Sequence, residues 1–166
     1  MEQTKTTFRP YEPSDLASIV ACESELQDHI AKLDPLNRER PKTAFDSKAY
    51  MDIILRQVKE NDGMIFVAES AGSIVGFIAG CLNQDSEAER VECYPSKDGK
   101  VLELIVLPEH RGQKIGFELM IRMEKFFKEK ACTAVIVDCF APNQSAYQFY
   151  KSLGYEDRLI SLLKML

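Results

Sequence analysis

One segment, residues 101–121, constrains the fold more than any other part of the chain. It begins with an apolar run from Val101 to Leu107 that is typical of a buried strand. Pro108 breaks this run, and a polar turn follows before apolar residues recur at helical spacing from Lys114 to Lys130. A buried strand that leads directly into an amphipathic helix is typical of a sheet covered by helices.

The rest of the chain predicts elements that suit such a sheet. Further strands are expected at residues 6–9, 64–69, 73–82 and 134–140, and further helices at 16–33, 46–59 and 143–153. Residues 91–93 are a candidate short strand, and residues 155–166 are expected to supply one or two final strands. The expected fold class is α/β (α+β), with one mixed, mostly antiparallel central sheet flanked by helices. No linker divides residues 1–166, which we expect to form a single domain.

Charge and cysteine content disfavour several classes of protein. The chain has 26 acidic and 21 basic residues, and this net charge of −5 disfavours nucleic-acid binding. The longest nearly pure apolar stretch, Ile74 to Leu82, is shorter than the roughly 20 residues of a membrane helix. Five cysteines without a Cys-x-x-Cys pair, and only two histidines, disfavour a disulfide framework and a metal site. We therefore expect a cytoplasmic protein with reduced thiols and no metal.

The turn after the apolar strand has features of an anion site. The first amides of a helix lack partners within the helix, and the helix dipole adds partial positive charge there. A diphosphate can accept hydrogen bonds from such amides. Gly112 and Gly116 permit close approach of a ligand, and Arg111 and Lys114 supply cations. The segment is neither a P-loop nor a dinucleotide fingerprint, and taken alone a Gly-x-x-x-Gly near a helix start is usually only a turn with a helix-packing glycine.

Two motifs follow one another in the second half of the chain: RGQKIG at residues 111–116 and NQSAYQFYKSLGY at residues 143–155. The first resembles the pyrophosphate-binding motif of the GNAT acetyltransferase superfamily, Gln/Arg-x-x-Gly-x-Gly/Ala, with Lys114 at the position that is normally glycine. The second resembles the Asn-x-x-Ala-x-x-x-Tyr pattern of that superfamily, followed by Leu-Gly-Tyr/Phe. The resemblance covers about residues 100–155 and implies the GNAT, or acyl-CoA N-acyltransferase, fold.

The resemblance implies an acetyl-CoA-dependent N-acetyltransferase, which transfers an acetyl group to a primary amine by direct attack. The diphosphate would lie in the turn, and the pantetheine arm would pair with backbone groups in a gap between the strands at 101–107 and 134–140. The residues expected to bind acetyl-CoA are Leu104, Ile105, Val106, Arg111, Gly112, Gln113, Lys114, Ile115, Gly116, Asn143 and Tyr150. Because of Lys114, a module that binds acyl-CoA without catalysis is the alternative.

The resemblance also implies two catalytic groups. Tyr150 matches the position of a general acid that protonates the leaving thiolate, although a core tyrosine bonded to a backbone carbonyl would look the same in sequence. Relatives commonly carry the general base at positions that correspond to Lys100 and Leu102, which cannot serve. Glu103 is the adjacent candidate, but strand alternation predicts that it faces away from Leu102. A solvent-exposed Glu103 and a water relay to another carboxylate are the alternatives.

The acceptor should meet the early helices and the acidic loop at residues 83–99, which lie outside the motifs. Glu23, Glu25 and Asp28 would attract a cationic amine, or they simply form a solvated acidic face. His110 is expected at the surface. Since members of the superfamily often dimerise through sheet edges or C-terminal strands, a homodimer that uses the apolar residues 159–166 is a candidate assembly.

Overall fold

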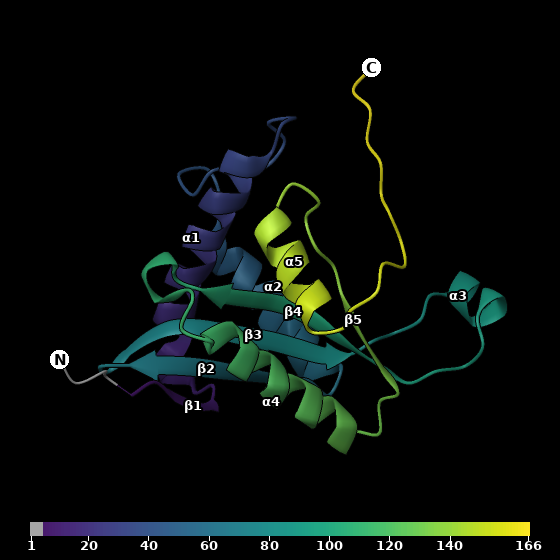
Figure 1. Ribbon diagram of the computed structural model, residues 1–166, viewed down its shortest axis with the longest axis horizontal. Helices are drawn as coiled ribbons and strands as arrows, with labels where there is room; N and C mark the ends of the chain where they lie inside the picture. The colour runs from purple at the N-terminus through teal and green to yellow at the C-terminus, as the bar shows by residue number, and fades with distance from the viewer. Residues whose placement is uncertain (1–4) are drawn as a thin grey trace.

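A five-stranded sheet forms the centre of the computed structural model, which describes residues 5–166 (Figure 1). Neighbouring strands are antiparallel except for the last two, which are parallel. The predicted mixed, mostly antiparallel sheet is therefore confirmed. The strands lie across the sheet in chain order: β1 (Thr7–Pro10), β2 (Met64–Ser70), β3 (Ser73–Leu82), β4 (Asp98–Val106) and β5 (Ala134–Val137).

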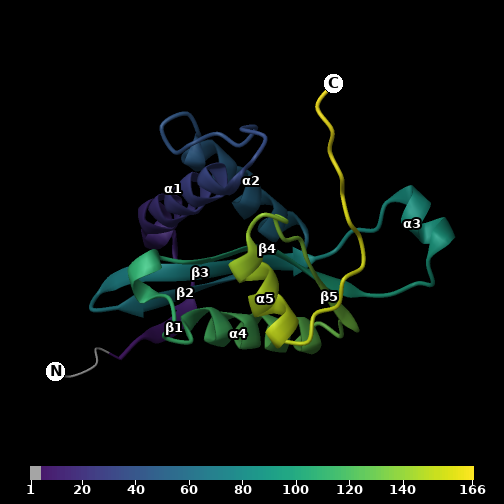
Figure 2. The same cartoon turned by 45° about the horizontal axis from the view of Figure 1, so that its top comes forward.

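Helices cover both faces of the sheet (Figures 1 and 2). On one face lie α1 (Leu16–Leu33) and α2 (Ser47–Glu60), which pack on the strands through Ile19, Met51 and Ile54. On the other face lie α4 (Ile115–Glu129) and α5 (Gln144–Ser152). No helix within residues 5–166 combines the length and the apolar character needed to cross a membrane.

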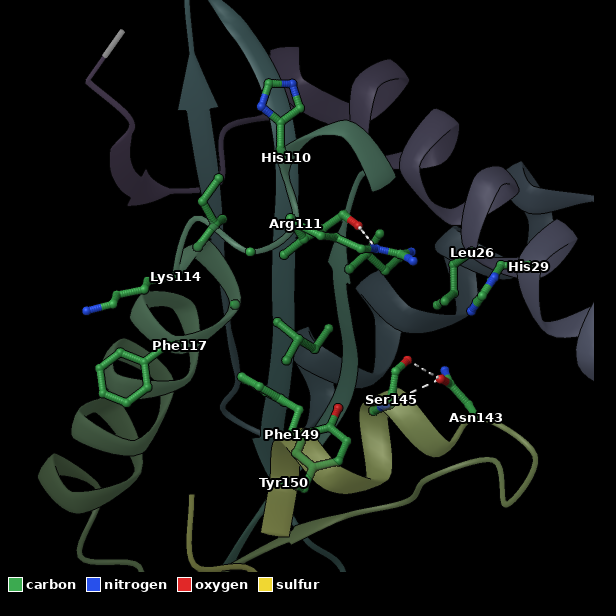
Figure 3. A pocket seen from close by; sticks show the side chains of 17 residues that line it. Leu26, His29, His110, Arg111, Lys114, Phe117, Asn143, Ser145, Phe149 and Tyr150 are labelled. Carbon is green, nitrogen blue, oxygen red and sulfur yellow. Dashed lines mark hydrogen bonds between the residues drawn. The ribbon is translucent and has the colours of Figure 1, made fainter. Parts of the chain in front are cut away.

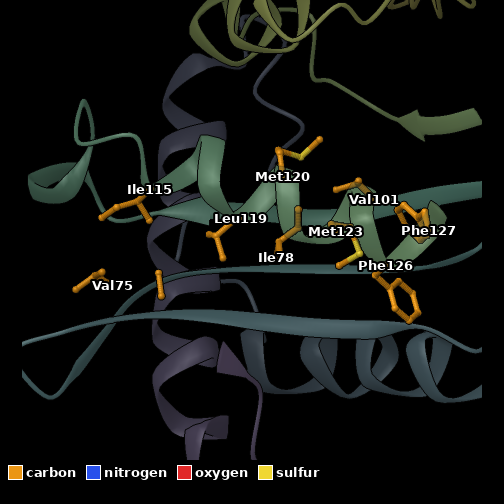
Figure 4. Close-up of a cluster of buried hydrophobic side chains, with 10 residues drawn as sticks. Val75, Ile78, Val101, Ile115, Leu119, Met120, Met123, Phe126 and Phe127 are labelled. Atoms are coloured by element: carbon orange, nitrogen blue, oxygen red, sulfur yellow. The ribbon is translucent and has the colours of Figure 1, made fainter. Parts of the chain in front are cut away.

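The helix α4 forms the centre of the second apolar layer. Its inward side chains, Leu119, Met123 and Phe127 among them, are buried against Ile78 and Val101 of the sheet (Figure 4). Their spacing of three and four residues places them on one face of the helix, as the sequence predicts. This packing fixes the start of α4 beside the end of β4.

Gly99 allows that close packing. A Cβ atom at Gly99 would lie 2.4 Å from Cγ of Phe127, so any larger residue would push α4 away from the sheet. The close packing of the C-terminal part of α4 on the sheet therefore depends on a glycine in β4.

Two of the strands predicted from the sequence are absent from the structure, and a third is shorter than predicted. Residues 91–93 form no strand, because α3 (Glu87–Glu92) occupies this region. The Ser86 side chain accepts from the Glu89 amide (3.2 Å), and the Glu89 carboxylate accepts from the Ser86 amide (2.9 Å). This reciprocal cap stabilises a helix start that alternation of apolar residues does not reveal.

The C-terminal prediction also differs from the structure. No strand follows α5, and β5 ends at Val137 rather than at Phe140. The apolar side chains of Leu159, Ile160 and Leu162 are exposed in an extended tail that leaves the body of the molecule (Figures 1 and 2). An extended sequence becomes a strand only when its main chain pairs with a neighbouring strand, and this segment pairs with none of the five strands within residues 5–166.

Candidate active site

The two parallel strands separate halfway along β4, as expected from the sequence. The last pair between β4 and β5 joins Val101 to Val137, whereas β4 continues to Val106. The Leu107 amide donates to the Val75 carbonyl of β3 at 2.9 Å. Because main-chain groups alternate in direction along a strand, those of Leu104 and Val106 point toward the open edge.

The turn that follows offers a row of main-chain donors. None of the six amides from Gly112 to Phe117 donates a hydrogen bond to a group within residues 5–166. Gly112 has a φ of +75°, which turns the chain so that this row faces one side. Free amides and the positive end of the α4 dipole together form an anion-binding surface.

The open edge and the free amides border the same cavity, which we call the first cavity (Figure 3). Its volume is about 610 Å³, and α5 forms the opposite wall through Asn143, Ser145, Ala146, Phe149 and Tyr150. All residues predicted to bind acetyl-CoA line it except Gln113, whose side chain instead reaches the Glu109 carbonyl. His29 and His110 also line it, and neither was predicted there.

Arg111 and Lys114 do not both supply cations to this cavity. The Nε atom of Arg111 donates to the Val106 carbonyl at 3.0 Å, so the guanidinium lies across the open edge of β4. The ammonium group of Lys114 points away from the other labelled side chains (Figure 3). Lys114 therefore contributes its amide to the donor row, while its side chain lies outside.

Lys114 has a φ of +63°, the left-handed conformation in which a side chain is strained. We expect Lys114→Gly to raise the free energy of unfolding by about 1 kcal/mol, because relief of that strain exceeds the extra entropy of glycine in the unfolded chain. Chemical denaturation of Lys114→Gly beside Lys114→Ala checks this, since alanine removes the charge but keeps the strain. Equal stability of the two variants would contradict it.

Asn143 is held by its own helix. Its side-chain oxygen accepts from the Ala146 amide (3.3 Å) and from the Ser145 hydroxyl (3.0 Å), which makes it the N-cap of α5. It lines the cavity as predicted, with its oxygen engaged in the protein.

Tyr150 occupies the junction of two cavities. It lines the first cavity and also a second cavity of about 260 Å³ that reaches toward α1 and α2. Its hydroxyl points into the space beside Phe149 (Figure 3) and bonds to no carbonyl within residues 5–166. Burial, with smaller effects of Cys139 and Glu103, raises the pKa of Tyr150 above its ordinary value of 10, so the phenol keeps its proton at neutral pH.

A bulge in β4 determines where Glu103 points. Ala79 of β3 pairs with Glu103 and Gly80 pairs with Val101, so Leu102 is an additional residue in β4. Leu102 packs with the α1 and α2 layer, and Glu103 accepts a hydrogen bond from the Tyr50 hydroxyl of α2. The prediction that Glu103 faces away from Leu102 is therefore wrong, because the extra residue interrupts alternation.

Glu103 is one of two neighbouring carboxyl groups in the second cavity. Burial raises the pKa of Glu103, and the hydrogen bond from Tyr50 partly opposes this rise. Burial and the nearby charge of Glu103 raise the pKa of Glu23, which is only 3% exposed. Glu103 is thus partly buried and has a carboxyl neighbour, and its raised pKa suits a proton acceptor near neutral pH.

Glu23 was predicted only as part of an acidic face of α1, but it is buried and lines the second cavity. Of Glu23, Glu25 and Asp28, only Glu23 lines a cavity, whereas Glu25 and Asp28 pair with Lys42 and Lys32. Its position between Ile19 and Leu26 on the apolar face of the helix was the available signal. No residue of the 83–99 segment borders either cavity, so the expectation that this loop contacts the acceptor has no support.

The arrangement offers acid–base and anion-binding groups. No cluster of three or more His, Cys, Asp or Glu side chains with the spacing of a metal site occurs in the described part of the chain. A ligand with a diphosphate and an extended, amide-bearing arm suits the first cavity, because its donors are neutral amides and its edge is an unpaired strand.

Comparison with known sequences is consistent with this geometry. Residues 30–155 match the Acetyltransferase (GNAT) family. An uncharacterized N-acetyltransferase of Archaeoglobus fulgidus is 36% identical over 107 residues, which are 64% of this chain and 67% of that protein. An uncharacterized N-acetyltransferase of Methanocaldococcus jannaschii is 31% identical over 101 residues, or 61% of this chain. The matched region spans only 42% of that second relative.

Solved structures share the fold. A mutant of the BH1408 protein from Bacillus halodurans superposes with a TM-score of 0.82 at 17% identity, covering 96% of this chain and 99% of the other. The aminoglycoside N-acetyltransferase AAC(6')-Iy, in complex with the bisubstrate analog CoA-S-monomethyl-acetylneamine, superposes with a TM-score of 0.67 at 18% identity, covering 98% and 99%. With the sequence match over residues 30–155, these findings show that the chain belongs to the Acetyltransferase (GNAT) family.

Proposed function

We propose that this protein is an acetyl-CoA-dependent N-acetyltransferase that acetylates a primary amine by direct attack. One observation carries the proposal: five residues with free amides (Gly112 and Lys114 to Phe117) and an unpaired strand edge border a cavity that meets a second cavity lined by carboxyl groups. The first cavity suits the acetyl donor, and the second suits the acceptor. Tyr150, Asn143, Leu104 and Ala146 border both, so the two substrates would meet there.

The amides from Gly112 to Phe117 would bind the diphosphate of acetyl-CoA, and the backbone of Leu104 and Val106 would pair with the pantetheine arm. Pairing at Val106 requires Arg111 to release the Val106 carbonyl. The released guanidinium can then contact the diphosphate, so the same movement frees the strand edge and adds a cation. The AAC(6')-Iy complex with a CoA analog supports this assignment.

The transfer needs two proton movements. The amine nitrogen forms a bond to the acetyl carbon while the carbon–sulfur bond breaks. Glu103 accepts the proton that the nitrogen loses, and Tyr150 donates its proton to the departing sulfur. A proton returned from Glu103 to Tyr150 through solvent restores both groups. An amide of the β4 edge would polarise the acetyl carbonyl during this step.

Tyr150→Phe tests the acid directly. We expect a fall in kcat of roughly 10- to 100-fold, because an unassisted thiolate is a poorer leaving group. The Kd for acetyl-CoA should stay near that of the wild type, since phenylalanine keeps the packing against Phe149 and Tyr155. Steady-state kinetics with calorimetric binding measures both, and an unchanged kcat would exclude the acid role.

A panel of amines with detection of free CoA thiol tests the proposed function itself. We expect thiol release that depends on both acetyl-CoA and an amine, with an acetylated amine of the expected mass. Binding of acetyl-CoA without thiol release from any amine would favour the non-catalytic module. The panel should span small aliphatic amines, aromatic amines, aminoglycosides and a lysine-containing peptide.

The proposal extends to assembly and location. We infer a homodimer in which the exposed apolar tail, residues 159–166, packs on a second copy, since its large apolar side chains are exposed in a single copy. All five cysteines are free, which supports a reducing compartment such as the cytoplasm. Analytical ultracentrifugation of the full chain beside a chain ending at Tyr155 would compare their masses.

A further inference from the structure

The second cavity carries more negative charge than a neutral acceptor requires. Its carboxyl groups are Glu23, Glu39, Glu103 and Asp138. Glu23 and Glu103 lie inside, whereas Glu39 and Asp138 are exposed at the surface. No Lys, Arg or His side chain of residues 5–166 lines the cavity. Among residues 5–166, the cation that pairs with one of these four groups is Lys100, whose ammonium lies 2.9 Å from the exposed Asp138.

Glu23 is the carboxyl group of this cavity that is best placed to bind a cation. One of its carboxylate oxygens, Oε2, is buried and has no hydrogen-bond partner in the described part of the chain. Buried polar atoms in folded proteins are nearly always paired, and an unpaired carboxylate is costly. Glu103 beside it forms no hydrogen bond with Glu23 within residues 5–166, and its nearby charge disfavours the charged form of Glu23. A positively charged ligand would satisfy this oxygen and relieve the repulsion at once.

The walls limit the shape of such a ligand. Leu26, Ile30, Val137 and Phe140 give the cavity apolar sides, and its volume is about 260 Å³. A slender methylene chain suits these sides, while the acidic groups suit charged ends. The cavity meets the first cavity at Leu104 and Tyr150, where the amine must reach the acetyl group.

We propose that the acceptor is an aliphatic primary amine that carries a second positive charge, and that Glu23 is the residue that selects for this charge. This inference rests on the proposed function and narrows it. Glu23 binds the cation through the oxygen that lacks a partner, while Glu103 receives the proton of the reacting nitrogen. Glu23 is thus a specificity residue rather than the base.

Three amines of equal chain length test the proposal: putrescine carries a second ammonium, n-butylamine carries a methyl group, and γ-aminobutyrate carries a carboxylate. We expect kcat/KM of the wild type to fall by about tenfold or more from putrescine to n-butylamine, and further for γ-aminobutyrate, because charge interactions in a partly buried site are strong. This series needs no variant. A wild type that acetylates n-butylamine as well as putrescine overturns the inference and leaves the proposed function standing.

Glu23→Gln supplies the residue-specific test. The ratio of kcat/KM for putrescine to that for n-butylamine should fall by about tenfold, because the amide cannot attract the second charge. A ratio within one variant is unaffected by partial loss of active protein. Glu25→Gln is the matched control, since it removes the same charge from the same helix at a position that lines neither cavity. Equal ratios in wild type and Glu23→Gln overturn the role of Glu23.

One outcome separates the inference from the function on which it rests. Acetylation of an aromatic amine, or of a peptide whose single lysine is its only positive charge, with none of the three short amines accepted, overturns the inference alone. Failure to acetylate any amine of the panel, with acetyl-CoA bound, overturns both.

Discussion

Replacing Glu103 by glutamine is expected to lower kcat for acetyl transfer by about 100-fold or more, because the amide cannot accept the proton that the attacking nitrogen loses. The Kd for acetyl-CoA should not change, since Glu103 lines only the second cavity. Stopped assays of thiol release, with binding measured by calorimetry, separate the two effects. A variant that keeps the kcat of the wild type would contradict the role of Glu103 as base.

The pH dependence of activity is a second test of Glu103 as the base. Burial raises the pKa of Glu103 above its ordinary value of 4.5, and only the carboxylate form accepts a proton. Activity of the wild type should therefore rise with pH, with a midpoint above 4.5, and Glu103→Gln should lose this rise.

Tyr50→Phe tests whether the Tyr50 hydroxyl stabilises the charged form of Glu103. The Tyr50 hydroxyl donates to Glu103 and favours its charged form, so loss of the hydroxyl should raise the pKa of Glu103 and move the rise in activity to higher pH. Glu23 is the other acidic group that faces Glu103, and Glu23→Gln should move the rise to lower pH by removing a like charge. A midpoint that moves with neither variant would show that another group titrates.

Gly116→Glu is expected to weaken acetyl-CoA binding by about 100-fold, because a carboxylate at the start of α4 repels the diphosphate and opposes the helix dipole. The fold should tolerate a side chain here. A Cβ atom at Gly116 would lie 3.6 Å from Phe149 and 3.7 Å from Val106, which is ordinary contact. Gly112 is a poorer choice, because its φ of +75° would strain any replacement.

Two variants separate the causes at this position. Gly116→Ala adds only the Cβ atom and should bind acetyl-CoA nearly as well as the wild type. Gly116→Gln has the size of glutamate without its charge, so the difference between Gln and Glu measures electrostatic repulsion. Equal Kd values for all three variants and the wild type would place the diphosphate elsewhere.

The sequence predicted what local patterns determine. The strand, turn and helix of residues 101–121 are contiguous, so apolar spacing, Pro108 and the glycines were enough to locate the free amides. The sheet type followed from the order of helices and strands. The cap formed by Ser86 and Glu89 was also visible in the sequence as Ser-x-x-Glu, although residues 91–93 were interpreted as a strand.

The bulge at Leu102 and the proximity of Glu23 to Glu103 were not predicted, because both depend on contacts between segments that are distant in the sequence. The bulge at Leu102 arises from pairing with β3, and no property of Leu102 itself predicts it. Glu23 meets Glu103 only because α1 packs across β4, which lies far along the chain. The base candidate and the specificity residue therefore emerge from packing, whereas the anion site emerges from sequence.

The central claim is that free main-chain amides bind the donor through its diphosphate, and one calorimetric comparison tests it. Acetyl-CoA and S-acetylpantetheine share the thioester and the pantetheine arm, but only acetyl-CoA has the diphosphate. The account predicts micromolar binding of acetyl-CoA and binding of S-acetylpantetheine at least about 100-fold weaker. Equal affinities, or no heat from acetyl-CoA at millimolar concentration, would contradict it.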